Sequence, residues 1–236
     1  MKVLKLLFKR ETAAPMLALT FASAVSVALV IARICWTGNI RYAFLIWNLF
    51  LAWLPLIFSL LACEQYQTGT RRNWRFPALA GAWLLFFPNA PYIFTDLIHL
   101  TARFYGHFWV DLMLILLCAF TGLVLGFVSL YLMQTVVTCM FGRLASWIFI
   151  ALVAGLTGFG IYLGRFLRYN SWDVLVRPVK FYHDVGAWAA GSLAYPTSVA
   201  FPMLFATFVF LAYLMLYALT HLPHTQQMAL ATNGQR

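Results

Sequence analysis

The chain has 236 residues, of which 64% are hydrophobic and only 9% are charged, and its mean hydropathy is +0.84. A soluble domain carries roughly 25% charged residues, so this composition excludes an ordinary soluble protein and predicts one that crosses a membrane several times. The net charge of +10 does not indicate a nucleic-acid partner, because loops beside anionic lipid accumulate Lys and Arg.

The N-terminal segment, residues 1–13, is a short basic lead that suits a cytoplasmic membrane interface. The first apolar span follows, from Pro15 to about Ala32. The small residues Ala22-Ser23-Ala24 offer a signal-peptide cleavage point as an alternative. Because the apolar run continues to Ile34, an uncleaved membrane span is favoured.

Five further spans follow. Each has about 20 residues, except the third span of the six, which is interrupted. They run from about Tyr42 to Cys63, from near Phe76, from Trp109 to Gln134, from Leu144 to Leu163 and from Val199 to Thr220. The sequence therefore predicts an all-α bundle of six transmembrane helices over residues 14–222. A polar C-terminal tail, residues 223–236, is expected to be unordered. Pro178 begins an expected interfacial helix between the fifth and sixth spans.

The third span is interrupted by the stretch Phe86–Arg103. Pro88 and Pro91 each lack an N–H donor and are expected to push the preceding residue out of the helical region. The twelve residues before the first proline span only ~18 Å, so the interruption lies within the bilayer. Asn89 either satisfies the carbonyl groups that the prolines leave unpaired or presents its amide to a ligand, and both roles can hold at once.

Beyond the prolines, helical spacing predicts one face with four polar residues: Tyr92, Asp96, His99 and Arg103. The i, i+3 pair Asp96 and His99 suits an acid–base pair, so these two are the candidate catalytic groups. A metal site would need a third ligand such as Asp111 or His183, so no metal is assigned and no cofactor is expected. The alternative role of Asp96 is a plain ion pair with an arginine.

The second polar motif, Gly164 to Asp173, follows the fifth span. Arg165 and Arg168 are predicted on one helical face, where they could form a fork for a phosphate or carboxylate. Snorkelling to lipid headgroups is the alternative, but it does not explain the neighbouring Asn170 and Asp173. With Asn48 near the outer end of the second span, the candidate ligand-binding residues are Asn48, Asn89, Tyr92, Arg165, Arg168, Asn170 and Asp173.

The four cysteines contain no C-x-x-C spacing and indicate neither a disulfide framework nor a zinc site. Glycines recur at G-x-x-x-G spacing as Gly122/Gly126 and Gly160/Gly164, which predicts close helix packing. Nine of the 16 Lys and Arg residues fall on the N-terminal side of the six-span topology, and this bias places the N-terminus in the cytoplasm.

Several motifs in order resemble a known family: Trp47-Asn48-Leu49-Phe50-Leu51-Ala52-Trp53, Phe87-Pro88-Asn89-Ala90-Pro91-Tyr92, Thr95-Asp96-Leu97, and Gly164-Arg165-Phe166 with Asn170-Ser171-Trp172-Asp173. The family is the bacterial multi-pass membrane family named domain of unknown function 1361. The resemblance implies a multi-pass protein of the bacterial cytoplasmic (inner) membrane and carries no activity.

Three functional hypotheses follow. The first is a lipid-handling or enzymatic membrane protein whose partners are membrane lipids, with an anionic headgroup held by the arginines. No nucleophile motif supports a hydrolase. The second is a transporter or channel subunit built around the broken helix, and the third is a structural or assembly protein in which the polar cluster only locks helices together. The sequence assigns neither a reaction nor an oligomeric state.

Overall fold

The computed structural model describes residues 13–69, 74–100, 107–192 and 197–233. This part of the chain is helical throughout, as predicted, and contains no strand. The elements in chain order are α2 (Ala13–Thr37), η1 (Ile40–Tyr42), α3 (Phe44–Gln67), α4 (Arg75–Phe86), α5 (Asn89–Tyr92), η3 (Ile93–His99), α6 (Phe108–Phe141), α7 (Arg143–Phe166), α8 (Asp173–Val176), α9 (Pro178–Ser192) and α10 (Thr197–Asn233).

Five helical stretches in the described part are long and apolar enough to cross a membrane: Ala14–Thr37, Ile40–Gln67, Phe108–Phe141, Arg143–Phe166 and Ser198–Thr220. They identify a multi-pass membrane protein. The remaining predicted span is the interrupted one, which is divided into α4, α5 and η3. None of these three pieces alone is long enough to cross.

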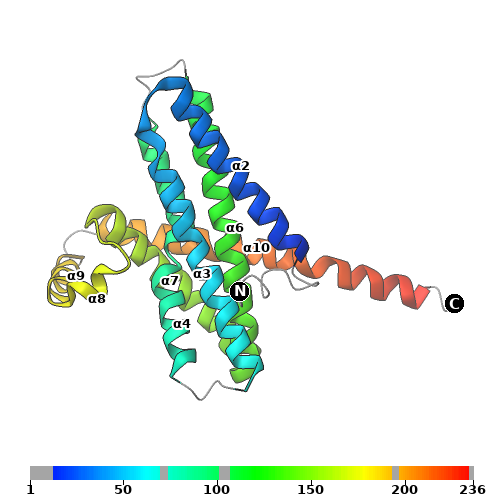
Figure 1. The fold of residues 1–236 in the computed structure, drawn as a ribbon. Helices are drawn as coiled ribbons and strands as arrows, with labels where there is room; N and C mark the ends of the chain where they lie inside the picture. Colours follow the sequence, from blue (N-terminus) through cyan, green and yellow to red (C-terminus); the bar gives the residue numbers. More distant parts are fainter. Residues whose placement is uncertain (1–12, 70–73, 101–106, 193–196, 234–236) are drawn as a thin grey trace.

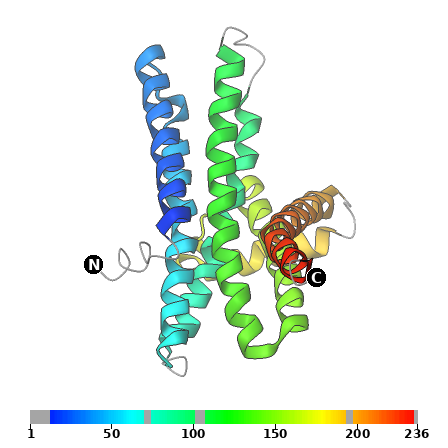
Figure 2. The same cartoon turned by 90° about the vertical axis from the view of Figure 1, so that its right-hand side faces the viewer.

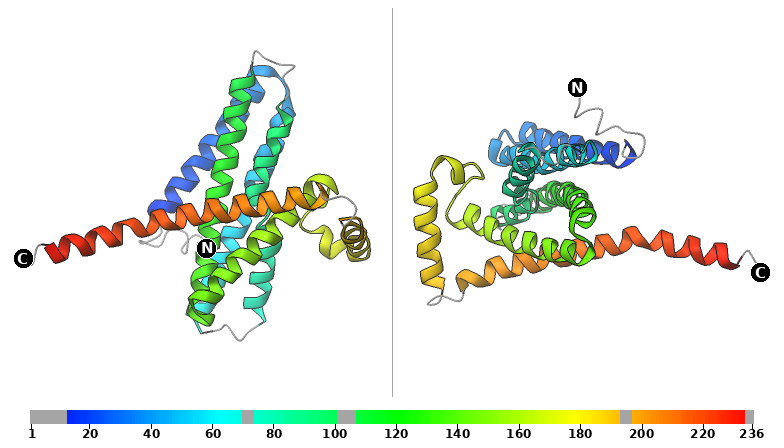
Figure 3. Two further views of the ribbon diagram at one scale, coloured as in Figure 1. Left: turned by 180° about the vertical axis from the view of Figure 1, so that it is seen from behind. Right: turned by 90° about the horizontal axis from the view of Figure 1, so that it is seen from below.

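The helices α2, α3 and α6 lie side by side, and the α4–α5–η3 segment runs along α3 and α6 (Figure 1). A view from the side shows α6 at the centre of this bundle (Figure 2). By contrast, α10 crosses the bundle and packs on α7, which the views from behind and from below make plain (Figure 3). The sequence predicted the last span from Val199 to Thr220, and the apolar stretch Ser198–Thr220 of α10 corresponds to it.

The crossing of α7 and α10 is possible because Gly158 lies directly against the carbonyl group of Pro202. A side chain at position 158 would separate the two helices. Beyond the crossing, α10 continues to Asn233, into the segment that was expected to be an unordered tail. The residues after Pro223 include Gln, Met, Ala and Leu, which favour helix.

Two pairs of glycines hold the interrupted segment between α6 and α7. A Cβ atom at Gly122 would lie 2.8 Å from Ile93 Cδ1, and one at Gly126 would lie 2.8 Å from Ala90 Cβ. The prediction that these glycines permit close packing is confirmed, and their partner is the proline-containing segment.

The second glycine pair lies on α7. A Cβ atom at Gly160 would lie 2.9 Å from Pro88 Cγ, and one at Gly164 would lie 3.2 Å from Tyr92 Cε2. The two pairs thus contact the same short segment from two helices, and they fix its position in the bundle.

The prolines interrupt the hydrogen bonds of the segment but bend its backbone less than expected. Phe87 keeps helical angles (φ −55°, ψ −40°), and Ala90 lies inside α5, so the prediction that both residues leave the helical region was wrong. Close packing on α6 and α7 overrides the local steric preference. The two prolines still lack N–H donors. The amide of Ala90 donates to the carbonyl oxygen of Phe87 at 3.1 Å.

The glycine packing leads to a stability prediction. Gly122→Ala should lower the free energy of unfolding by about 1–3 kcal/mol, because the added methyl group overlaps Ile93 Cδ1 and lies 3.0 Å from the Ala90 carbonyl oxygen. The matched control is Gly155→Ala, where an added Cβ meets nothing within 4 Å, so the better helix propensity of alanine should leave stability unchanged or higher. Thermal unfolding in detergent measures both. An equal change in stability in Gly122→Ala and Gly155→Ala would contradict the close packing of Gly122 on the interrupted segment.

Candidate functional site

Asp96 joins three helical elements although its side chain is only 2% exposed. Asn48 Nδ2 on α3 donates a hydrogen bond of 2.8 Å to Asp96 Oδ2. Arg165 Nη1 on α7 lies 3.5 Å from Asp96 Oδ1. A carboxylate buried among apolar helices is costly unless it is paired, so these contacts tie α3 and α7 to the interrupted segment. The predicted alternative for Asp96, an ion pair with an arginine, is confirmed.

His99 lies beside Asp96, with His99 Nε2 at 3.9 Å from Asp96 Oδ1. Both residues are in the 3₁₀ helix η3, where residues three apart are stacked along the axis. The carbonyl oxygen of His99 accepts a hydrogen bond from Arg41 Nη2 at 3.2 Å. The candidate acid–base pair is therefore in contact, whereas Arg103, the last member of the predicted face, lies outside the described residues.

Asn89 repairs the interruption in the third segment. Its Nδ2 donates to the carbonyl oxygen of Phe86 at 2.9 Å and also approaches Ser171 Oγ at 2.9 Å. Because the amide of Ala90 bonds to Phe87 instead of Phe86, the Phe86 carbonyl would otherwise lack its helical donor. One predicted role of Asn89, satisfying a carbonyl at the prolines, is confirmed. The bond to Ser171 also brings the second polar motif against the first.

The sequence predicted Arg165 and Arg168 on one helical face, and this prediction was wrong. The helix α7 ends at Phe166, and Arg168 has φ +58°, in the left-handed region. The next amide, that of Tyr169, donates back to the carbonyl of Leu163 at 3.2 Å, which closes the helix end. Glycine usually occupies such a position, and a residue with a Cβ pays roughly 1 kcal/mol there. Arg165 consequently contacts Asp96, whereas Arg168 lies at the cavity, and the two side chains form no fork.

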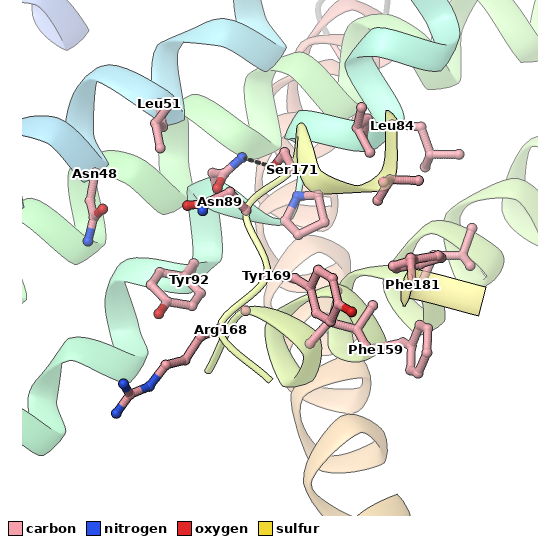
Figure 4. A pocket seen from close by; sticks show the side chains of 18 of the residues that line it. Asn48, Leu51, Leu84, Asn89, Tyr92, Phe159, Arg168, Tyr169, Ser171 and Phe181 are labelled. Carbon is pink, nitrogen blue, oxygen red and sulfur yellow. Dashed lines mark hydrogen bonds between the residues drawn. The ribbon is translucent and has the colours of Figure 1, made fainter. Parts of the chain in front are cut away.

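A cavity of about 620 Å³ lies between α3, α4, α7 and the segment that follows α7. Figure 4 shows Asn48, Tyr92 and Arg168 on one side of it and Leu84, Phe159 and Phe181 on the other. The polar and charged side chains that line it are Asn48, Asn89, Tyr92, Arg168, Tyr169, Asn170 and Ser171.

Five of the seven candidate ligand-binding residues therefore line the cavity. Arg165 and Asp173 do not, and neither do the candidate catalytic residues Asp96 and His99. Asp96 is connected to the cavity through Asn48, which both donates to Asp96 and lines the cavity wall. The roles assigned to these residues from sequence stay predictions.

Charge distinguishes the two arginines. The Arg165 side chain is 16% exposed and is compensated by Asp96. Arg168 is exposed, and within the described residues no acidic side chain forms an ion pair with it. Asp173, one of the candidate ligand-binding residues, accepts hydrogen bonds from the amide and side chain of Asn170. Arg168 thus places a positive charge, without an acidic partner among the described residues, at the edge of the cavity, where its side chain extends past Tyr92 (Figure 4).

The segment after α7 is held by a contact with α9. Tyr169 Oη donates to Asp184 Oδ2 at 2.7 Å, and this bond lowers the pKa of the Asp184 carboxyl. Partial burial, together with the same bond, raises the pKa of Tyr169. A carboxyl whose pKa is lowered by folding stabilises the fold above its unfolded pKa, and the stabilisation is lost as the pH falls through the folded value. The contact therefore weakens in acid, when Asp184 is protonated, and in strong base, when Tyr169 loses the proton that it donates.

A second buried ion pair was not predicted from sequence. Arg33 Nε on α2 lies 2.7 Å from Asp111 Oδ1 on α6, and Tyr42 Oη donates to Asp111 Oδ2 at 3.1 Å. The available signal was positional, since all three residues fall at the same end of adjacent predicted spans. Asp111 is therefore engaged away from Asp96, and His183 lies on α9 beside Asp184. Within the described ranges, no three His, Cys, Asp or Glu side chains converge on a metal position.

The fold and the site define a multi-pass helical membrane protein in which a cavity with polar and apolar walls adjoins a proline-interrupted segment. The family model described as "Protein of unknown function (DUF1361)" matches residues 47–215, and the chain belongs to this family. The matched region contains the interrupted segment and the cavity. No curated protein and no solved structure matches the chain.

The Asp96 contacts lead to a second stability prediction. Asp96→Asn should lower the free energy of unfolding by about 3 kcal/mol, because it leaves Arg165 without its buried partner. The double variant Asp96→Asn/Arg165→Gln should recover part of this loss. Asp173→Asn, which alters only an exposed turn, serves as the control and should cost less. Chemical unfolding in detergent measures these variants together with the single variant Arg165→Gln. If the effect of the double variant equalled the sum of the two single effects, coupling between Asp96 and Arg165 would be ruled out.

Proposed function

We propose that this chain is an integral protein of the bacterial cytoplasmic membrane that binds an anionic group, a phosphate or a carboxylate, in the cavity beside the interrupted segment. The observation that carries the proposal is Arg168, an arginine at the cavity with no acidic partner among the described residues. A guanidinium binds both kinds of anion through two parallel hydrogen bonds.

The surroundings of Arg168 support anion binding. Asn89, Tyr92, Asn170 and Ser171 line the same cavity and supply side-chain donors. Arg168 extends past the hydroxyl group of Tyr92 (Figure 4). A residue held in a sparsely populated backbone region often marks a ligand site, and the left-handed conformation turns this arginine away from Arg165.

The proposal includes a topology. The α4–α5–η3 segment is the sixth crossing, the N-terminus is cytoplasmic, and α9 lies at the opposite, outer interface. Support comes from contacts between helix ends that the topology places on one side. Arg33 pairs with Asp111, and Arg41 bonds to the carbonyl of His99.

Asp96 and His99 have a positioning role in this proposal. Asp96 is separated from the cavity and orients Asn48, which lines it. A purely structural function is the second candidate, and the pairing of Asp96 with Arg165 and Asn48 favours it. If the function is purely structural, replacing Arg168 would not change ligand binding.

Arg168→Gly tests the proposal, because it removes the charge and suits the left-handed backbone. We expect stability to stay within about 1 kcal/mol of the native protein. We also expect the variant to lose its preference for phosphatidylglycerol over phosphatidylcholine in native mass spectrometry. Arg177→Ala is the control, since Arg177 is exposed and does not line the cavity. An unchanged lipid preference in Arg168→Gly would contradict anion binding and favour the structural role.

A further inference from the structure

We infer that the bound anion is the headgroup of a lipid, and that the acyl chain of this lipid lies between α4 and α7 after entering sideways from the bilayer. This inference rests on the proposed anion site at Arg168. It adds that the ligand is a long-chain amphiphile and not a small soluble phosphate or carboxylate.

The cavity changes character along its length. Its polar side chains gather near Asn89 and Arg168, whereas its other end is lined by Gly81 and Leu84 of α4 and by Leu156 of α7. Gly81 and Asn89 are eight residues apart, or roughly 12 Å at the rise of a helix. One end thus suits a charged headgroup, and the other suits hydrocarbon.

The two helices that enclose the apolar end, α4 and α7, pack against different neighbours. Helix α4 packs on α3, while α7 packs on α6 and α10. The cavity occupies the space between α4 and α7, with Leu84 and Leu85 on one wall and Leu156 and Phe159 on the other.

The apolar end is continuous with the outside of the helix bundle. Leu156 lines the cavity and is nevertheless 50% exposed, and Leu152, one turn earlier on α7, is 62% exposed. A Cβ atom added at Gly81 would meet nothing within 4 Å. In a membrane, this exposed face of α7 meets acyl chains. A small soluble anion would leave the apolar walls uncovered, whereas a lipid chain covers them.

Gly81 allows the chain site to be blocked without touching the anion site. Gly81→Leu places a side chain in open space within the apolar end, and leucine favours helix more than glycine does, so the thermal midpoint should not fall. Gly155→Leu is the matched control, because Gly155 also has open space but does not line the cavity. The probes are dioleoyl and dihexanoyl phosphatidylglycerol, measured by native mass spectrometry of the full chain.

We expect Gly81→Leu to retain at least tenfold less dioleoyl phosphatidylglycerol than the native protein and to bind the dihexanoyl form as before. Gly155→Leu should bind both normally, and Arg168→Gly should lose both. Undiminished binding of the dioleoyl form by Gly81→Leu would overturn the inference and leave the anion site standing. Equal losses in Gly81→Leu and Gly155→Leu would also overturn it, since the effect would not depend on the cavity. Failure of Arg168→Gly to lower either probe would instead overturn the proposed anion site.

Discussion

The close packing of the segment Pro88–Ile93 between α6 and α7 is the constraint on which the rest of the structure depends. Two glycines on each helix leave room for it, and a Cβ atom at three of the four positions would come within 3.0 Å of the segment. The prolines remove two backbone donors from this segment. Asn89 donates to the Phe86 carbonyl, which lacks its helical donor because the amide of Ala90 bonds to Phe87.

The polar site follows from this packing. Because the segment is pressed against α7, Asp96 reaches Arg165 and Asn89 reaches Ser171. The first contact neutralises one arginine in the interior. The second directs the chain after α7 over the cavity, where Arg168 adopts a left-handed conformation and keeps its charge uncompensated among the described residues. Two arginines three residues apart therefore lie in different environments, because Arg165 is paired with Asp96 in the interior and Arg168 is exposed at the cavity.

Much of the fold could be predicted from hydrophobic runs, since five of the six predicted apolar spans appear as long helices. The meeting of the two polar motifs was also predictable, because burial makes unpaired charges costly. The crossing of α10 was not, since it depends on the contact of Gly158 with Pro202, which no local pattern reveals. The position of Arg168 was missed for a similar reason. Helical spacing assumes that the helix continues, and α7 ends two residues earlier.

The central claim is that a lipid fills the cavity, with its headgroup at Arg168 and its chain between α4 and α7. The most direct measurement is an experimental structure of the protein in nanodiscs that contain phosphatidylglycerol. The account predicts elongated density that begins beside Arg168 and Tyr92 and passes between Leu85 and Leu156. A cavity closed by the contact of α4 with α7, or lipid density confined to the outer surface of the bundle, would contradict it.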